Sequence, residues 1–471
     1  MIDRQELLEL SREFSLRPDI VEKDYALGWL LAGIGQHPDT APTWVFKGGT
    51  CLKKCYFETY RFSEDLDFTL REPSHLDENV LLKAFEEIAE RVYEQSGLEI
   101  PREGLKFDVY LNPRDKPSVL GRIGYRGPIA PRGDLPRIKL DLTSDEVVAL
   151  PPVRRKVHHG YSDEPVEGIE VLCYPYEEVF AEKLRALGER ELPRDLYDVI
   201  HLYRHPGMRP DREVVLRVLR EKSQFKGIPM PTFEALKREP HRTELEQEWS
   251  NMLAHQLPAL PPFDEFWSEL PQVFEWLAGI VVPTTLQRIA AGADEDSQWT
   301  PPPMAQAWGM VIPLETIRCA AANHLCVNLG YHGTKRIIEP YSLRSTKNGN
   351  LILHAIRLDN REHRSYRVEE IQSAEVTQRV FTPIYAVELT PAGPIYAPLQ
   401  SRSGSVHPRG KTFSRGGKTS FTPTLKYIIE CSVCGKRFTR SRMDTTLNAH
   451  KDKSGYPCYG RYGHCVESKY S

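Results

Sequence analysis

The stretch FKGGTCLKKCYFETYRFSEDLDFTL, residues 46–70, places two acidic side chains in a pattern suited to chemistry on phosphate. Asp65 and Asp67 alternate with apolar residues. In an extended strand, alternate side chains point to the same face, so both acids share one face and the apolar residues line the other. Neighbouring like charges repel. Mg²⁺ is a suitable compensating partner because it is bound by one or two carboxylates together with substrate phosphates.

A second acidic strand extends this pattern. In RIKLDLT, residues 137–143, Asp141 lies on the polar face of an alternating run, beside Asp65 and Asp67 if the strands are neighbours. Three carboxylates from two strands make a two-metal site, which activates an attacking hydroxyl and stabilises the leaving oxyanion of a displacement at phosphorus. The turn Gly48-Gly49-Thr50, ahead of a helix, offers backbone N–H groups to a polyphosphate.

The elements that must position these residues follow from periodicity and turn signals. Strands are expected over residues 44–46, 62–70, 121–129 and 137–143, and helices over residues 1–35, 50–60, 76–94, 176–190 and 194–203, with a helical stretch to about residue 278. The segment AAGADEDSQWTPPPM is a linker by composition, and residues 314–390 alternate like a small β module.

Composition places the chain among cytoplasmic proteins with a nucleic-acid contact. No apolar run approaches the ~18 residues of a membrane span, and MIDRQELLELSREF lacks the layout of an export signal. Residues 401–471 hold 14 Lys and Arg against 4 Asp and Glu, which leaves −13 for residues 1–400. A basic tail on an acidic body is typical of nucleic-acid binding, and a solvated tail is the alternative.

The ordered motifs resemble the AbiEii/AbiGii-type nucleotidyltransferase toxins, a MenT-like branch of the DNA polymerase β-like superfamily found in toxin-antitoxin and abortive-infection systems. The resemblance covers FKGGTCLKKC…YRFSEDLDFTL, IKLDLT, EEVFAEKLRAL, RDLYDVIHL and, near the N-terminus, VEKDYALGWLL, or roughly residues 1–280. It implies an α+β fold in which a polymerase β-like nucleotidyltransferase core is followed by a helical half. It further implies Mg²⁺ or Mn²⁺ as cofactor, a nucleoside triphosphate as substrate, and RNA, including tRNA, as acceptor.

The resemblance assigns roles residue by residue. Its catalytic residues are Asp65, Asp67, Asp141, Lys183 and Asp195, of which the first three bind Mg²⁺; Gly48, Gly49, Thr50, Ser63 and Lys183 bind the nucleotide; Asp198 completes the RDxxD motif. A lysine is a compact point charge suited to phosphate. Each role has a plain structural alternative. Lys183 could be a helix-surface charge, Asp195 a helix N-terminal charge, Asp198 a partner of Arg194, and Lys47 merely solvated.

Residues 314–375 resemble a WYL-like module, a small SH3-like β fold associated with bacterial regulators and thought to sense nucleic acid or nucleotides. The likeness rests on Tyr331, Arg336, the EPYSL turn and RSYRVEEI, which contains Arg364 and Arg367. At the name-giving triplet, residues 351–353 read LIL instead, which puts ligand binding in doubt. The three arginines are candidates for phosphate contacts.

The tail carries a zinc-binding pattern. Four of the nine cysteines lie in the last 41 residues. Cys431-x2-Cys434 is a chelating turn, and His450 with Cys458 completes a four-ligand set at zinc-ribbon or finger spacing, with His464 and Cys465 as competing fourth ligands. Such a segment has too little apolar content to fold without a metal. The other cysteines are expected to be reduced core residues.

These observations predict six regions: a nucleotidyltransferase core (1–205), a helical subdomain (206–290), a linker (291–310), a WYL-like β module (311–395), a basic linker (396–424) and a zinc-binding module (425–471). The predicted function is Mg²⁺-dependent transfer of a nucleoside monophosphate to RNA by a toxin or antiphage-defence effector, with an antitoxin or defence-system protein as partner and no membrane. The alternative is a nucleic-acid-binding sensor or regulator whose transferase core is inactive or modifies protein.

Overall fold

The chain forms two units in this computed structural model, Met1–Leu399 and Gln400–Ser471. The structure describes residues 1–14, 16–58, 60–129, 134–204, 210–281, 286–290, 292–295, 314–389, 425–431, 433–434, 436–440, 450–451, 457–458 and 463–470. The predicted linkers, 291–310 and 396–424, therefore lie outside the described residues except for 292–295. The boundaries of the six predicted regions stay a prediction.

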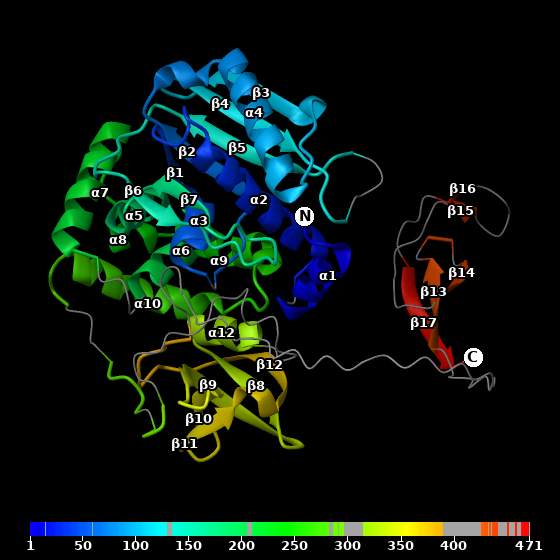
Figure 1. Ribbon diagram of the computed structural model, residues 1–471. Helices are drawn as coiled ribbons and strands as arrows, with labels where there is room; N and C mark the ends of the chain where they lie inside the picture. The colour runs from blue at the N-terminus through cyan, green and yellow to red at the C-terminus, as the bar shows by residue number, and fades with distance from the viewer. Residues whose placement is uncertain are drawn as a thin grey trace. The chain divides into compact units, whose positions relative to one another are not determined.

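A seven-stranded mixed sheet organises the first unit (Figure 1). Its strand order is β3-β4-β5-β2-β1-β7-β6, and the pairs β2/β5 and β1/β7 are parallel. The strands are β1 (Trp44–Lys47), β2 (Asp65–Leu70), β3 (Leu105–Leu111), β4 (Pro117–Gly124), β5 (Arg137–Thr143), β6 (Val153–Lys156) and β7 (Glu170–Cys173).

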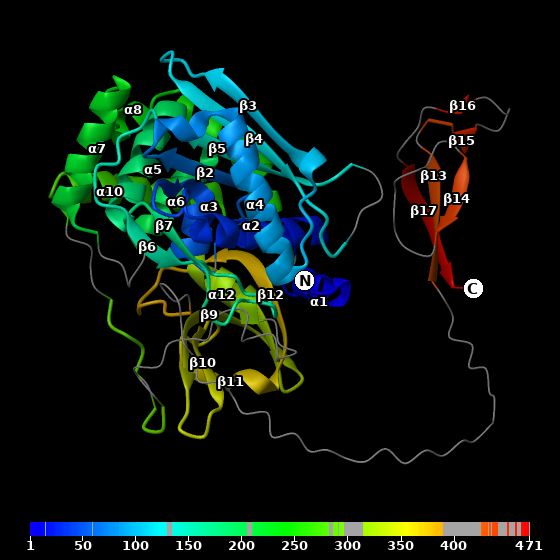
Figure 2. The same ribbon diagram turned by 45° about the horizontal axis from the view of Figure 1, so that its top comes forward.

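Helices cover this sheet and extend it into a helical half. They are α1 (Arg4–Glu13), α2 (Pro18–Gln36), α3 (Gly48–Cys51), α4 (Glu78–Ser96), α5 (Tyr176–Arg190), α6 (Pro193–Arg204), α7 (Arg212–Lys226), α8 (Phe233–Leu236), α9 (His241–Leu253) and α10 (Phe263–Leu277). Figures 1 and 2 show α4 lying over β3, β4 and β5. The Phe85 ring of α4 packs 5.1 Å from the Phe107 ring of β3. One hydrophobic core includes residues from Ile2 to Leu277, so sheet and helical half share it.

The expected β module follows as a second core. Helix α12 (Leu314–Ala322) packs on an antiparallel sheet of order β11-β10-β9-β8-β12, formed by β8 (Leu325–Tyr331), β9 (Thr334–Ser345), β10 (Leu351–Arg357), β11 (His363–Arg367) and β12 (Ile371–Val380). Sequence alternation did not predict α12. Arg318 on α12 is fully buried and pairs with Glu58 at 3.1 Å and Glu315 at 3.2 Å.

The second unit contains short strands only among its described residues. They are β13 (Leu425–Cys431), β14 (Arg437–Arg440), β15 (His450–Lys451), β16 (Pro457–Cys458) and β17 (Gly463–Tyr470). The predicted α+β class, with a β module after a mixed core, is confirmed. None of the helices in the described part combines the length and apolarity that a membrane crossing requires.

Candidate active site

The three candidate carboxylates lie on one face of the central sheet. Strands β2 and β5 are parallel neighbours, and their register pairs Asp67 with Asp141. Asp65 is two residues before Asp67, so its side chain shares the same face. Leu66, Phe68 and the other alternate residues of these strands are buried on the opposite face. All three acids are half-buried, which leaves the cluster open to a ligand.

A buried lysine stands beside this cluster. The antiparallel β1/β2 register places Lys47 opposite Asp67. Its ammonium forms an ion pair with Glu146, and the two side chains are only 13% and 11% exposed. Lys47 is therefore not simply a solvated charge. Glu146 was missed from the sequence, although it follows LDLT within the acidic run SDE.

Burial raises the proton affinity of two of these acids, Asp67 and Asp141. Burial raises the pKa of Asp67 to about 6, with Asp141 and Asp65 adding to the rise and Lys47 opposing it. Burial also raises the pKa of Asp141, which Lys47 opposes and Glu146 and Asp65 reinforce. Three oxygen ligands whose charges are only partly compensated fit a hard divalent cation.

The first two residues of α3, Gly48 and Gly49, fit closely against neighbouring side chains because they have no Cβ. Gly48 has φ +82°, and a Cβ there would lie 2.1 Å from Asp67 Oδ2. A Cβ on Gly49 would lie 2.5 Å from Arg61 Nη2 and 3.0 Å from Ser63 Oγ. Both glycines therefore permit a close approach that any other residue would block.

Thr50 has a structural contact. Its side chain is fully buried, and its hydroxyl donates a hydrogen bond to the Asp65 carbonyl. This bond ties the turn to the strand that carries the acids. The half-buried Ser63 precedes that strand.

Lys183 belongs to a buried ion network. Its Nζ lies 2.6 Å from Asp198 Oδ2 and 3.3 Å from Asp195 Oδ1, and the lysine is 5% exposed. Asp198 also binds Arg61 at 2.7 and 2.8 Å. Asp195 binds Arg190 at 2.7 and 2.9 Å. The alternative that Lys183 is a helix-surface charge is therefore wrong. Among the described contacts, Asp198 pairs with Lys183 and Arg61 and not with Arg194.

The charges of this network reach the carboxylate cluster. Burial raises the pKa of Asp198, but Arg61 and Lys183 outweigh that effect and hold the pKa below its usual range. Lys183 in turn lowers the pKa of Asp67. Both RDxxD acids are 0% exposed. Their geometry suits holding cations in place, and sequence reasoning missed Arg61 and Arg190 as their partners.

Three tail cysteines come together in the second unit. The sulfur atoms of Cys431, Cys434 and Cys458 lie within 4.8 Å of one another. The β15/β16 register pairs His450 with Cys458. The side chains of His450, His464 and Cys465 lie outside the described part of the chain. Three thiols at this separation fit a soft or borderline cation such as Zn²⁺.

Other predicted thiols and arginines have structural surroundings. Cysteines 51, 55, 173, 319 and 326 are buried and unoxidised, and the first three cluster within 4.8 Å, which the sequence did not reveal. In the β module, Arg364 and Arg367 are more than half exposed and pair with glutamates. Arg336 lies over the rings of Tyr331 and Tyr366.

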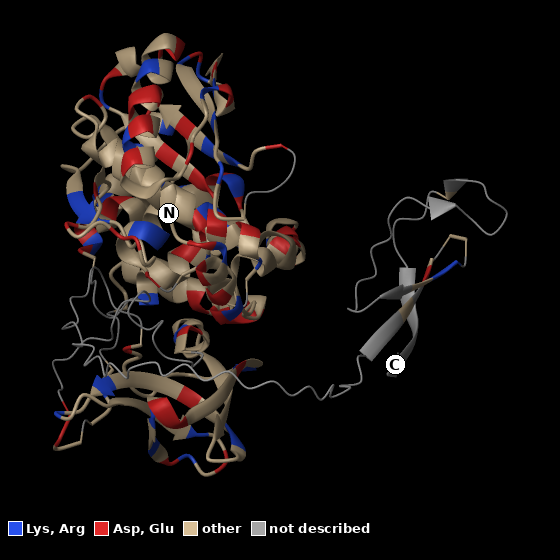
Figure 3. Ribbon diagram, turned by 45° about the vertical axis from the view of Figure 1, so that its right-hand side comes forward, with Lys and Arg blue, Asp and Glu red and all other residues tan. Residues whose placement is uncertain are grey.

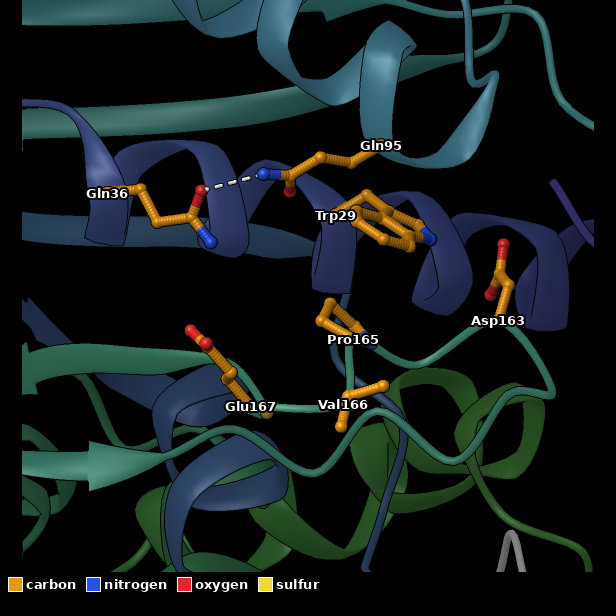
Figure 4. A pocket seen from close by; sticks show the side chains of 8 residues that line it. Trp29, Gln36, Gln95, Asp163, Pro165, Val166 and Glu167 are labelled. Atoms are coloured by element: carbon orange, nitrogen blue, oxygen red, sulfur yellow. Dashed lines mark hydrogen bonds between the residues drawn. The ribbon is translucent and has the colours of Figure 1, made fainter.

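A separate pocket of about 340 Å³ lies beside α2 (Figure 4). Trp29, Gln36 and Gln95 form one side, and the loop from Asp163 to Gly168 forms the other. Asp163 already accepts a hydrogen bond from Tyr25 at 2.7 Å. The pocket contains none of the predicted catalytic residues.

Comparison with known proteins identifies the family. The family model described as "Nucleotidyl transferase AbiEii toxin, Type IV TA system" matches residues 29–269. Among solved structures, MenT4, a nucleotidyltransferase toxin from Mycobacterium tuberculosis, is 19% identical with a TM-score of 0.40, over 58% of this chain and 89% of its own. JHP933 from Helicobacter pylori is 18% identical with a TM-score of 0.34, over 56% and 94%. No curated protein matches the sequence. The match over half the chain shows that this protein belongs to the AbiEii nucleotidyltransferase toxin family and is a nucleotidyltransferase.

Proposed function

We propose that the chain transfers a nucleoside monophosphate from a nucleoside triphosphate to an RNA acceptor, tRNA included, and acts as a toxin in antiphage defence. The observation that carries this proposal is the placement of Asp65, Asp67 and Asp141 on one half-buried sheet face. An acceptor hydroxyl oxygen attacks the α-phosphorus and releases its proton to solvent, the bond to the bridging oxygen of the β-phosphate breaks, and pyrophosphate leaves. The family's description as a toxin-antitoxin system supports an antitoxin as partner.

Mg²⁺ or Mn²⁺ would be held by the three carboxylates and would stabilise the charge that develops on the reacting oxygens. The bare Gly48-Gly49 backbone lets the triphosphate approach the carboxylates, and Ser63 lies beside it. Lys183 neutralises triphosphate charge. Asp195, expected to be catalytic, acts as a positioning residue, because its fully buried carboxylate holds Lys183 and Arg190.

The alternative of a sensor with an inactive or protein-modifying core makes a different prediction. Incubation of the protein with each labelled nucleoside triphosphate, Mg²⁺ and total cellular RNA shows which macromolecule carries label. Labelled RNA supports the proposal. Label on protein alone, or none with any of the four nucleotides, contradicts it.

The first prediction concerns Asp67. Asp67→Asn should abolish label transfer, because it removes one ligand charge without changing the side chain's size. In EDTA the folded wild type has a raised Asp67 pKa, near 6, so it binds this proton more tightly than the unfolded chain does. Through this one group the wild type should lose stability relative to the variant as pH rises from about 4 to 6. Melting temperatures at pH 4.5 and 7 test this, and a fully active variant would place the centre elsewhere.

The second prediction separates crowding from backbone strain at Gly48. Gly48→Ala should abolish transfer, because the new methyl group would overlap the Asp67 carboxylate. Gly349→Ala is the matched control, since Gly349 has the same φ of +82° but nothing within 4 Å of its Cβ position. Both variants bear backbone strain of about 1–2 kcal/mol. Equal transfer rates in the two variants, measured with labelled nucleotide, would argue against the assignment.

The third prediction concerns Lys183. Lys183→Ala should lower kcat/KM for the nucleotide at least tenfold, which corresponds to about 1.4 kcal/mol. Because this change also leaves Asp195 and Asp198 with fewer cations, urea unfolding is measured alongside. Lys183→Arg retains the charge and should stay folded, but should remain slow, because a guanidinium differs from an ammonium in shape. Lys237→Ala, at an exposed Glu234 pair, is the control. If both Lys183 variants kept the wild-type rate at low nucleotide concentration, Lys183 would have no role in neutralising the triphosphate.

The fourth prediction is that the tail binds structural Zn²⁺ through Cys431, Cys434, Cys458 and His450. Metal analysis of the purified full chain should give one zinc per chain, and Cys434→Ser should lose it. Cys326→Ser, in the β module, should keep it. Chelation should unfold the second unit, while the first unit, which contains the transferase core, keeps its melting transition. A chain without zinc, or a Cys434 variant that retains it, would refute this site.

A further inference from the structure

Acidic and basic residues are interspersed over the first unit (Figure 3), so its net charge does not reveal where an anionic partner would bind. The register of the central sheet is more informative. It aligns Asp65 of β2 with Lys139 of β5, Lys139 with Arg122 of β4, and Arg122 with Lys106 of β3. Directly opposed residues share a face, so one row of three cations begins next to the carboxylate cluster.

This cationic row is accessible. Lys106 and Lys139 are exposed and Arg122 is half-buried, whereas their neighbours along the same strands are buried on the other face. That other face is covered by α4, as the Phe85–Phe107 contact shows. Within the described residues, neither lysine forms an ion pair. Adjacent strands lie about 4.8 Å apart, so the row extends about 14 Å from Asp65 to Lys106.

Apolar and aromatic groups lie on the same face. Leu120 is the register partner of Asp141 and is half-buried. Tyr110 of the edge strand β3 pairs with Ser118, which in turn pairs with Thr143. The Tyr110 side chain is 42% exposed. A basic row and an exposed aromatic ring on the same sheet face are the combination that binds single-stranded nucleic acid, through phosphates and stacked bases respectively.

We propose that this sheet face binds the single-stranded end of the RNA acceptor, with Lys106, Arg122 and Lys139 on its phosphates and Tyr110 against a base. The inference rests on the proposed function and adds the surface that delivers the acceptor hydroxyl to Asp141. A single strand fits because the reacting hydroxyl must reach half-buried carboxylates from one open face.

One acidic group interrupts the cationic surface. Asp108 of β3 forms an ion pair with Arg122, and the two side chains are 61% and 36% exposed. An exposed pair of this kind contributes little to stability, so the guanidinium can exchange Asp108 for a phosphate. Asp108→Asn should therefore tighten RNA binding, which a purely structural pair would not do.

The experiment uses the full chain and a labelled eight-nucleotide single-stranded RNA. Binding is measured by fluorescence anisotropy without nucleotide, at several salt concentrations. Lys106→Ala/Lys139→Ala should weaken binding at least tenfold and lower the salt slope by about 1.4, because each single-strand phosphate contact contributes about 0.7. Lys83→Ala, an exposed lysine on α4, is the control and should behave like the wild type. The basic tail is common to all variants, so differences report on the sheet.

A second readout tests the aromatic contact and separates a failure of this inference from a failure of the proposed function. Tyr110→Ala should raise the KM for RNA about tenfold, Tyr110→Phe should restore it, and the KM for nucleotide should not change. If the lysine and tyrosine variants keep the wild-type affinity, salt slope and KM for RNA, the inference is overturned. The transferase assignment then stays intact. Variants that lose binding to an acidic peptide but keep their binding to RNA would also overturn it. Failure of the wild type to label any RNA would instead refute the proposed function.

Discussion

The structure of this transferase is arranged around the mutual repulsion of three carboxylates. Asp65, Asp67 and Asp141 share a sheet face because β2 and β5 pair with Asp67 opposite Asp141, and Asp65 lies two residues before Asp67 on the same strand. Burial raises the pKa of Asp67 and of Asp141, so the folded chain holds these two charges at a cost. Lys47, paired with Glu146, compensates only part of it. A neutral residue at Asp67 or Asp141 would remove that cost.

The surrounding ion network makes that arrangement rigid. Asp198 binds Lys183 and Arg61, and Arg61 donates a further hydrogen bond to Gln256 at 2.9 Å. Arg61 also crowds the position that a side chain on Gly49 would occupy. A buried ion pair therefore fixes the segment before β2 to helix α6, and a hydrogen bond to the neutral Gln256 fixes it to the chain after α9. Removing Asp198 would take from the buried Arg61 its described carboxylate partner, and breaking a buried pair in this way typically costs about 3–5 kcal/mol.

Local patterns in the sequence predicted the carboxylate strands, the glycine turn and the long helices, because those depend on spacing along the chain. Alternation located β2 and β5, and 3.6-residue periodicity located α4 and α5. The edge strand β3 was not predicted, since Val109, Tyr110 and Leu111 are all exposed and interrupt the alternation. The sequence likewise did not predict contacts between residues that are distant along the chain. Lys47 and Glu146 are 99 residues apart, and no spacing rule connects them.

The two C-terminal modules obtain their stability by different means. Helix α12 and the residue that follows it contact the transferase core through buried side chains. Arg318 pairs with Glu58, and Asn323 accepts a hydrogen bond from Tyr197 at 3.2 Å. Tyr197 stands next to Asp198 in α6, and Glu58 precedes Arg61. The β module is therefore attached to the two segments that carry Arg61 and Asp198. Among the described side chains of the tail, Cys431 and Cys458 form a small buried cluster against which Cys434 and Phe438 pack. The tail is therefore held by contacts among thiols, whereas the β module is held by a hydrophobic core and buried ion pairs.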